Sequence, residues 1–134
     1  MKTEVRILAV EDEKAVAQFL ALLLGGPHCK VVTACDGLDA LGKMSAAIEP
    51  FDIVITDHNM PRRTGLELVR ELRERNFGGK IAVLSAYLTP PTVQAYEELN
   101  VDLMLSKPFD IDELRHAIDV LAQEAPAFAG RPAA

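Results

Sequence analysis

Short apolar runs recur along the chain and alternate with longer segments in which apolar and polar residues are mixed. The runs are rich in β-branched residues and too short for helices, which is typical of strands that are buried on both faces of a sheet. Five such strands are predicted, at residues 5–10, 30–33, 53–56, 81–84 and 101–105.

The segments between these runs place their apolar residues at the spacing of amphipathic helices. The third helix is predicted over residues 65–75 and the fourth over 91–99, where Pro91 is tolerated because it lies in the first turn. The fifth begins at Asp110, which precedes Glu113 by three residues as in a capping box. The positions predicted to face the core are Val16, Leu20, Leu23 and Leu24, then Leu38, Leu41 and Met44, then Leu68, Val69 and Leu72, and finally Leu114, Ala117, Ile118 and Leu121.

Strand and helix alternate five times along the chain. This order predicts an α/β fold with a doubly wound parallel sheet, in which right-handed crossovers place helices on both faces. A length of 134 residues suits one domain. The periodicity is lost from residue 124 onward, so we expect a frayed tail or the start of a linker there.

The composition is that of an ordinary globular protein, with 49% hydrophobic and 25% charged residues. The formal charge of −6, from 20 acidic and 14 basic residues, disfavours direct binding to nucleic acid or to an anionic membrane. No apolar run reaches the ~18 residues of a spanning helix, and the N-terminus does not show the pattern of a signal peptide, so we expect a cytoplasmic protein. Cys29 and Cys35 flank one predicted strand, which would hold them too far apart for a disulfide.

The residues that follow the predicted strands carry most of the chemistry of this sequence. In a parallel sheet the carboxyl ends of the strands meet at one edge, where such folds bind their ligands. A single acidic residue at such a place is more often a helix cap than a functional group. Asp57 differs because its helix does not begin at once, and we expect this side chain to be exposed on a loop. The residues gathered at this edge are Glu11, Asp12, Glu13, Asp57, Ser85, Ser106, Lys107 and Pro108.

Three carboxylates that converge at one edge would repel one another unless a cation joined them. Mg²⁺ suits this set because it prefers oxygen ligands, whereas the three histidines fall on different elements and form no zinc site. With Mg²⁺ bound, a carboxylate oxygen of Asp57 can attack phosphorus. Lys107 and Ser85 would then supply a positive charge and a hydroxyl donor to the phosphoryl oxygens.

Four segments of the sequence together resemble the receiver domain of two-component response regulators. They are residues 7–13 (ILAVEDE), 57–61 (DHNMP) with Gly65, 85–86 (SA) and 107–109 (KPF). The resemblance covers residues 4–122 and leaves 123–134 as a flexible tail or the start of a linker. It implies a CheY-like, flavodoxin-like (βα)5 fold whose five parallel strands lie in the order 2-1-3-4-5.

The resemblance implies a role for each residue at the edge of the sheet. Asp57 is implied as the phosphoacceptor, while Lys107 and Ser85 contact the phosphoryl group. The peptide bond before Pro108 is expected to be cis. The implied Mg²⁺ ligands are Asp12, Asp57 and the carbonyl of Asn59, with Glu11 holding a metal-bound water.

The resemblance also implies partners for the chain. The phosphoryl donor would be a sensor histidine kinase or a histidine phosphotransfer protein, and the phosphorylated chain would act on a downstream protein target or effector domain. Phosphorylation would pull Ser85 inward and change the face made by the fourth helix, fifth strand and fifth helix. A homodimer formed through this face is one arrangement that the family implies. The protein would not be an enzyme with a separate substrate, because it would catalyse only its own phosphorylation and dephosphorylation.

The sequence departs from the usual receiver pattern at two positions. Glu11 stands where many members have aspartate, and this longer side chain is a familiar alternative. Met104, three residues before Lys107, stands where many members have a switching tyrosine or phenylalanine. Tyr87 is either a substitute for that aromatic residue or a plain surface residue. A further expectation concerns 62–63, an arginine pair that we expect to be solvated rather than a docking site.

Two other classes of protein compete with this interpretation. A phosphatase of the haloacid dehalogenase type also uses an aspartyl nucleophile, but it needs a second aspartate two residues later, where this sequence has Asn59. A receiver that takes no phosphate and acts only as a protein-interaction module would not need the complete set of site residues. A flavodoxin-like cofactor domain would need a Ser/Thr- and Gly-rich turn after the first strand to hold the flavin phosphate, and the sequence has none there.

Overall fold

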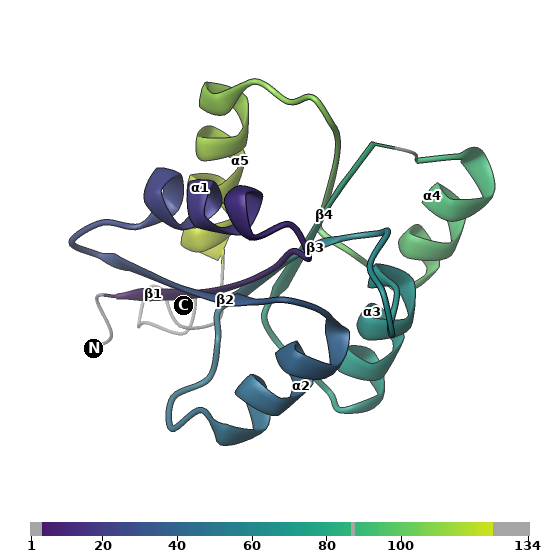
Figure 1. Ribbon diagram of the computed structural model, residues 1–134, viewed down its shortest axis with the longest axis horizontal. Helices are drawn as coiled ribbons and strands as arrows, with labels where there is room; N and C mark the ends of the chain where they lie inside the picture. Colours follow the sequence, from purple (N-terminus) through teal and green to yellow (C-terminus); the bar gives the residue numbers. More distant parts are fainter. Residues whose placement is uncertain (1–3, 87, 125–134) are drawn as a thin grey trace.

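The five apolar runs form a parallel sheet in the computed structural model, which describes residues 4–86 and 88–124 (Figure 1). Helices follow each strand in turn. The strands are β1 (Val5–Val10), β2 (Cys29–Ala34), β3 (Ile53–Asp57), β4 (Lys80–Ser85) and β5 (Leu103–Ser106). The helices are α1 (Lys14–Leu24), α2 (Gly37–Ala46), α3 (Gly65–Glu74), α4 (Pro90–Glu98) and α5 (Ile111–Glu124).

The strands lie in the order β2-β1-β3-β4-β5, and all four neighbouring pairs are parallel. Helices α1 and α5 cover one face of this sheet, and α2, α3 and α4 cover the other (Figure 1). The predicted α/β, doubly wound, flavodoxin-like fold with order 2-1-3-4-5 is therefore confirmed.

Alternate residues of the strands divide the core into two clusters, one on each face of the sheet. On β1, Leu8 and Val10 pack toward α2 and α3, whereas Ile7 and Ala9 pack toward α1 and α5. Burying one large aliphatic side chain stabilises a fold by about 1.5–3 kcal/mol, so strands that are apolar on both faces are held firmly at the centre. The sheet is thus a rigid support for the loops at its edge.

Side-chain caps begin four of the described helices, α2 to α5, and the sequence predicted only the cap of α5. Thr64 and Glu67 form a complete capping box at α3, although the sequence was not interpreted in this way there. At α4 the cap is Thr89, one residue before Pro90, so this helix begins one residue earlier than predicted. Asp110 caps α5, since its Oδ1 accepts hydrogen bonds from the amides of Asp112 (2.8 Å) and Glu113 (3.2 Å).

Other details of the predicted elements also differ from the structure, including β3 and β4, which extend one residue or more beyond the predicted bounds. Leu38 is 44% exposed, because it lies about 100° around α2 from the buried Gly37. β5 begins at Leu103 instead of residue 101, because the carboxylate of Asp102 accepts a hydrogen bond from the Ile81 amide in place of a strand carbonyl. β2 is longer than predicted, since all six of its residues pair with β1.

Other expectations concern the cysteines and the ends of the chain. Cys29 and Cys35 are both free, as predicted. Helix α5 continues to Glu124, so residues 123 and 124 of the predicted tail are helical, whereas Tyr87 and residues 125–134 lie outside the described residues. In the part of the chain that the structure describes, no helix is both long enough and apolar enough to cross a membrane.

Candidate functional site

The acidic residues Glu11, Asp12 and Asp57 come together at the carboxyl ends of β1 and β3. Val10 of β1 pairs with Thr56 of β3, so the next residue on each strand, Glu11 and Asp57, lies at the same level of the sheet. Carboxylate oxygens of the three residues lie within 4.8 Å of one another. All three were predicted at this edge from the sequence, whereas Glu13, predicted there as well, is not part of the group.

Asp57 is more enclosed than the sequence suggested. It is the last residue of β3, paired with Leu84 of β4, and its side chain is only 12% exposed, so the expected exposed position on a loop is wrong. Its Oδ1 accepts a hydrogen bond of 2.8 Å from the amide of His58. Burial raises the pKa of Asp57, although the charge of Lys107 and the His58 amide act in the opposite direction.

Lys107 bridges the acidic residues, and its closest carboxylate is Glu11. Its Nζ lies 2.9 Å from Oε1 of Glu11 and 3.8 Å from Oδ1 of Asp57. Burial raises the pKa of Glu11, an effect that the hydrogen bond from Lys107 offsets only in part. Burial also lowers the pKa of Lys107, but the hydrogen bond to Glu11 and the charges of Glu11 and Asp57 outweigh it, so the pKa of Lys107 is raised.

The end of β5 sets the position of Lys107. The strand ends at Ser106, and the amide of Lys107 then donates a hydrogen bond of 2.8 Å to the carbonyl of Ser85 at the end of β4. The Lys107–Pro108 peptide bond is cis, as expected. The backbone of β4 thus holds the start of the segment that carries the ammonium group.

Ser85 and Asn59 occupy different surroundings from the carboxylates. Ser85 is fully buried at the end of β4. Asn59 is exposed, two residues after Asp57, and its amide lowers the pKa of the Asp57 carboxyl. Contact of Ser85 with a phosphoryl group and of the Asn59 carbonyl with a metal ion remain predictions.

The loop between β3 and α3 is attached to α2 by an ion pair that the sequence did not indicate. Arg62, which has a positive φ of 65°, pairs with Asp36, the buried N-cap of α2. The amide of Asp39 is the largest cause that lowers the pKa of Asp36, and Arg62 adds to it. Arg63 lies 3.8 Å from Glu71. Both arginines keep contact with solvent, but they are paired and not a free basic patch.

His58 and Tyr96 form a second pair that sequence reasoning missed. The Nδ1 of His58 lies 2.7 Å from the hydroxyl of Tyr96, and the two rings meet edge to face with centroids 5.6 Å apart. Tyr96 is fully buried, and burial together with the charge of Asp57 raises its pKa. The only signal in the sequence was an aromatic residue within a predicted amphipathic helix, which is ordinarily a core residue.

The donor set at the acidic edge fits a hard divalent cation. Three carboxylates approach one another, and each of them offers oxygen donors. The ammonium group of Lys107 lies among them. Oxygen donors from one or two carboxylates, completed by a carbonyl and water, are the ligands that Mg²⁺ takes in proteins. The residues present therefore fit the predicted ion.

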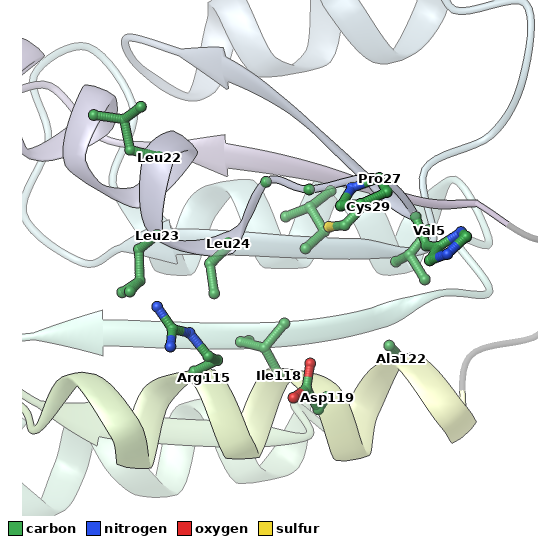
Figure 2. Close-up of a pocket in the computed structure, with 14 residues that line it drawn as sticks. Val5, Leu22, Leu23, Leu24, Pro27, Cys29, Arg115, Ile118, Asp119 and Ala122 are labelled. Atoms are coloured by element: carbon green, nitrogen blue, oxygen red, sulfur yellow. The ribbon is translucent and has the colours of Figure 1, made fainter.

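A larger hollow of about 690 Å³ lies between α1 and α5, at the opposite end of the sheet (Figure 2). Its lining includes Val5 and Cys29, which begin β1 and β2, and Leu24 at the end of α1. Burial raises the pKa of Cys29 to about 11, so its thiol is a poor nucleophile at neutral pH. The chemistry is thus concentrated at the acidic edge and not in this hollow.

A family model of the response regulator receiver domain matches residues 7–119. The chain belongs to this family. Its receiver domain is 33% identical over 114 residues to the transcriptional regulatory protein DltR of Streptococcus agalactiae, which covers 81% of this chain and 48% of DltR. It is 34% identical over 121 residues to the response regulator ArlR of Staphylococcus aureus, which covers 90% of this chain and 54% of ArlR. The chain thus spans about half the length of these relatives.

The fold of the receiver domain is also similar to solved structures. The response regulator TrrA of Thermotoga maritima, solved in complex with Mg²⁺-BeF, is 32% identical with a TM-score of 0.75, over 87% of this chain and 98% of that one. The chain therefore shares its fold with solved receiver structures, TrrA among them.

Proposed function

We propose that this receiver domain accepts a phosphoryl group on Asp57 from a phosphohistidine of a sensor histidine kinase or a histidine phosphotransfer protein. The observation that supports this most directly is the convergence of Glu11, Asp12 and Asp57 within 4.8 Å, with Lys107 Nζ 3.8 Å from Asp57. Membership of the receiver family supports the same conclusion. A phosphatase that uses Asp57 would need a second acidic residue two positions later. Asn59 stands there, so we do not expect this chain to hydrolyse small phosphate esters.

The transfer step that we propose is a displacement at phosphorus. Oδ1 of Asp57 already accepts the His58 amide and faces Lys107, so we assign the attack to Oδ2. A bond forms from Oδ2 to phosphorus while the bond from phosphorus to the donor imidazole nitrogen breaks, and the electron pair stays on that nitrogen. Lys107 neutralises charge on the transferred group, because its raised pKa keeps it protonated at neutral pH.

Asp12, Asp57 and the carbonyl of Asn59 are the proposed ligands of Mg²⁺, with Glu11 holding a bound water. When bound, the ion neutralises the repulsion between the carboxylate and the phosphoryl group. Lys107 holds Glu11 in place through their hydrogen bond of 2.9 Å. The TrrA structure contains Mg²⁺ with BeF, which supports this choice of ion for a related chain.

The phosphorylated domain is proposed to act through protein contacts in the cytoplasm. Its binding partner would be a downstream target protein or an effector domain. The face made by α4, β5 and α5 is the proposed contact surface, for such a partner or for a second copy of the chain. Ser85 is fully buried at the end of β4, and we propose that its hydroxyl moves toward a phosphoryl group on Asp57. That movement is the proposed first step of the conformational change.

Intact mass measurement after incubation with acetyl phosphate and Mg²⁺ tests the proposal. We expect the wild-type chain to gain the mass of one phosphoryl group, Asp57→Asn to gain none, and the exposed control Glu97→Gln to behave as wild type. Chelation of Mg²⁺ should abolish the gain. Labelling that persists in Asp57→Asn would show that another residue is the acceptor.

A further inference from the structure

Tyr96 joins α4 to the loop that follows the phosphoacceptor. It is the only fully buried residue of α4, and its hydroxyl lies 2.7 Å from Nδ1 of His58, a residue 38 positions earlier in the chain. Because the ring is enclosed in the core cluster with Leu68 and Val83, it cannot follow a moving partner without moving the helix that carries it.

His58 is also in direct contact with the carboxylate of Asp57. Its amide donates the 2.8 Å hydrogen bond to Oδ1, while its imidazole contacts Tyr96. One residue thus connects the two groups, through its backbone on one side and its side chain on the other. Any displacement of the His58 backbone at Asp57 would therefore also move the imidazole that contacts Tyr96.

Gly65 keeps this connection tight. A Cβ at this position would lie 2.3 Å from the carbonyl oxygen of Asp57, 2.8 Å from the hydroxyl of Tyr96 and 3.0 Å from Cα of His58. The amide of Gly65 also donates a hydrogen bond of 2.9 Å to the carbonyl of His58. The three residues therefore pack directly against the start of α3, with no space for an independent movement of one of them.

The position of the usual switching aromatic residue cannot provide the same link here. Met104 lies on β5 opposite Val83 and is partly buried against the core cluster that contains Tyr96. Its thioether is at most a weak hydrogen-bond acceptor and has no O–H group. Tyr96 therefore supplies a buried phenol near the site, but from α4 and not from β5.

We propose that the hydrogen bond between His58 and Tyr96 transmits the phosphorylation state of Asp57 to helix α4. This inference rests on the proposed function, because it requires that Asp57 is phosphorylated. Phosphorylation removes the ionised carboxylate that the His58 amide contacts and adds a larger anionic group beside it. The altered amide contact shifts His58, the shift changes the hydrogen bond to Tyr96, and α4 adjusts because its buried anchor has moved.

Tyr96→Phe removes only the hydroxyl and keeps the buried ring. Amide chemical shifts of residues 90–98 are measured with and without beryllofluoride and Mg²⁺, and we expect the response of α4 to fall to less than half that of wild type. Met104→Leu is the matched control, since it changes a neighbouring core residue without touching the hydrogen bond, and it should keep the full response. An unchanged response in Tyr96→Phe would overturn the proposal.

Variants of His58 test the link from its other end. Asn has a polar atom near the position of Nδ1, so His58→Asn should keep most of the response, whereas His58→Phe should lose it. If the hydrogen bond is the route, the double variant His58→Phe with Tyr96→Phe should be no worse than either single variant. Additive losses in the double variant would contradict the proposal. If Tyr96→Phe does not fold, the comparison of His58→Asn with His58→Phe still tests the hydrogen bond, and equal responses of these two variants would overturn the proposal.

Mass measurement separates this inference from the proposed function. Tyr96→Phe should gain one phosphoryl group with acetyl phosphate as wild type does, because its hydroxyl contacts His58 and not the carboxylate. If the wild-type chain gains none, the proposed function fails and this inference fails with it. If only Tyr96→Phe gains none although it is folded, Tyr96 acts on the transfer itself and the inference alone is overturned.

Discussion

The ammonium group of Lys107 lies 2.9 Å from Oε1 of Glu11, nearer than the 3.8 Å that separates it from Oδ1 of Asp57. The Glu11 side chain is almost fully buried, so this pair is shielded from solvent. The cation that is expected to meet the phosphoryl group is therefore held by a second carboxylate. Glu11 has two tasks as a result, because it binds Lys107 and is also proposed to hold a water of the metal ion.

Variants at the two ends of this pair should change Mg²⁺ affinity in opposite directions. Lys107→Ala removes a positive charge beside the proposed ligands, so Mg²⁺ should bind on the order of threefold to tenfold more tightly while phosphorylation by acetyl phosphate becomes slower. Glu11→Gln removes a negative charge and should weaken binding by a similar factor. Calorimetric titration measures both, with the exposed variant Glu97→Gln on α4 as control. Equal weakening by both variants would show that the pair matters only for folding.

Asp57→Asn should make the metal-free protein more stable at neutral pH. Burial raises the pKa of Asp57, and a carboxyl whose pKa is raised in the folded state contributes stability below its unfolded pKa that is lost as the pH rises through the folded value. Urea unfolding in the presence of a chelator should therefore favour the variant at pH 7, and the difference should disappear near pH 3.

Addition of Mg²⁺ should reverse that order at pH 7. An ion concentration of 100 times the dissociation constant adds about 2.7 kcal/mol to the stability of a protein that binds it only when folded. Wild type should gain this stabilisation, and Asp57→Asn should gain much less. If Asp57→Asn without Mg²⁺ is less stable than wild type without Mg²⁺ at pH 7, the attraction between Lys107 and the Asp57 carboxylate outweighs the destabilising effect of burying that charge.

Gly65→Ala should destabilise the fold by about 1–3 kcal/mol, because the new methyl group would overlap the Asp57 carbonyl and the Tyr96 hydroxyl. Gly42→Ala is a matched control within α2, where an added Cβ meets nothing within 4 Å. Replacement of this helical glycine should stabilise by about 0.5–1 kcal/mol. Thermal or urea unfolding measures both variants, and similar behaviour of the two would mean that the site relaxes easily around Gly65.

Asp36→Ala should cost about 0.5–2 kcal/mol at neutral pH, because it removes the N-cap of α2. The pKa of Asp36 is lowered, chiefly by the Asp39 amide, so its contribution is present above the unfolded pKa and is lost as the pH falls through the folded value. The difference in unfolding free energy from wild type should shrink at low pH. Asp36→Asn keeps an oxygen that can cap the helix, so it should lose less than Asp36→Ala; equal losses would attribute the effect to the ion pair with Arg62.

Residues that follow strands were predictable, whereas side-chain partners were not. The apolar runs determine a parallel sheet, and the sheet alone brings Glu11, Asp57 and Lys107 to one edge. The preference of Lys107 for Glu11 depends on ångström differences between side chains, which no spacing rule contains. Asp57 was expected to be exposed because its helix starts late, but strand pairing with Leu84 continues to that residue and encloses it.

The contact between His58 and Tyr96 was beyond the reach of the sequence for another reason. Its members lie 38 positions apart on a loop and a helix, and no periodicity relates them. An aromatic residue on an amphipathic helix predicts burial, which is correct for Tyr96, but it does not indicate which polar group its hydroxyl meets. Met104 indicated only that the usual aromatic residue is missing, and it did not indicate where a replacement lies.

Burial is distributed unequally among the five described helices, since α3 has four fully enclosed residues and α4 has only Tyr96. Segments with few buried contacts open most readily in native proteins, so the backbone amides of α4 should exchange with deuterium before those of α3. Because α4 adds only Tyr96 to the buried core, its loosening would expose fewer buried side chains than a loosening of α3. The helix that we propose to respond to Asp57 is thus also one that the fold can release at small energetic expense.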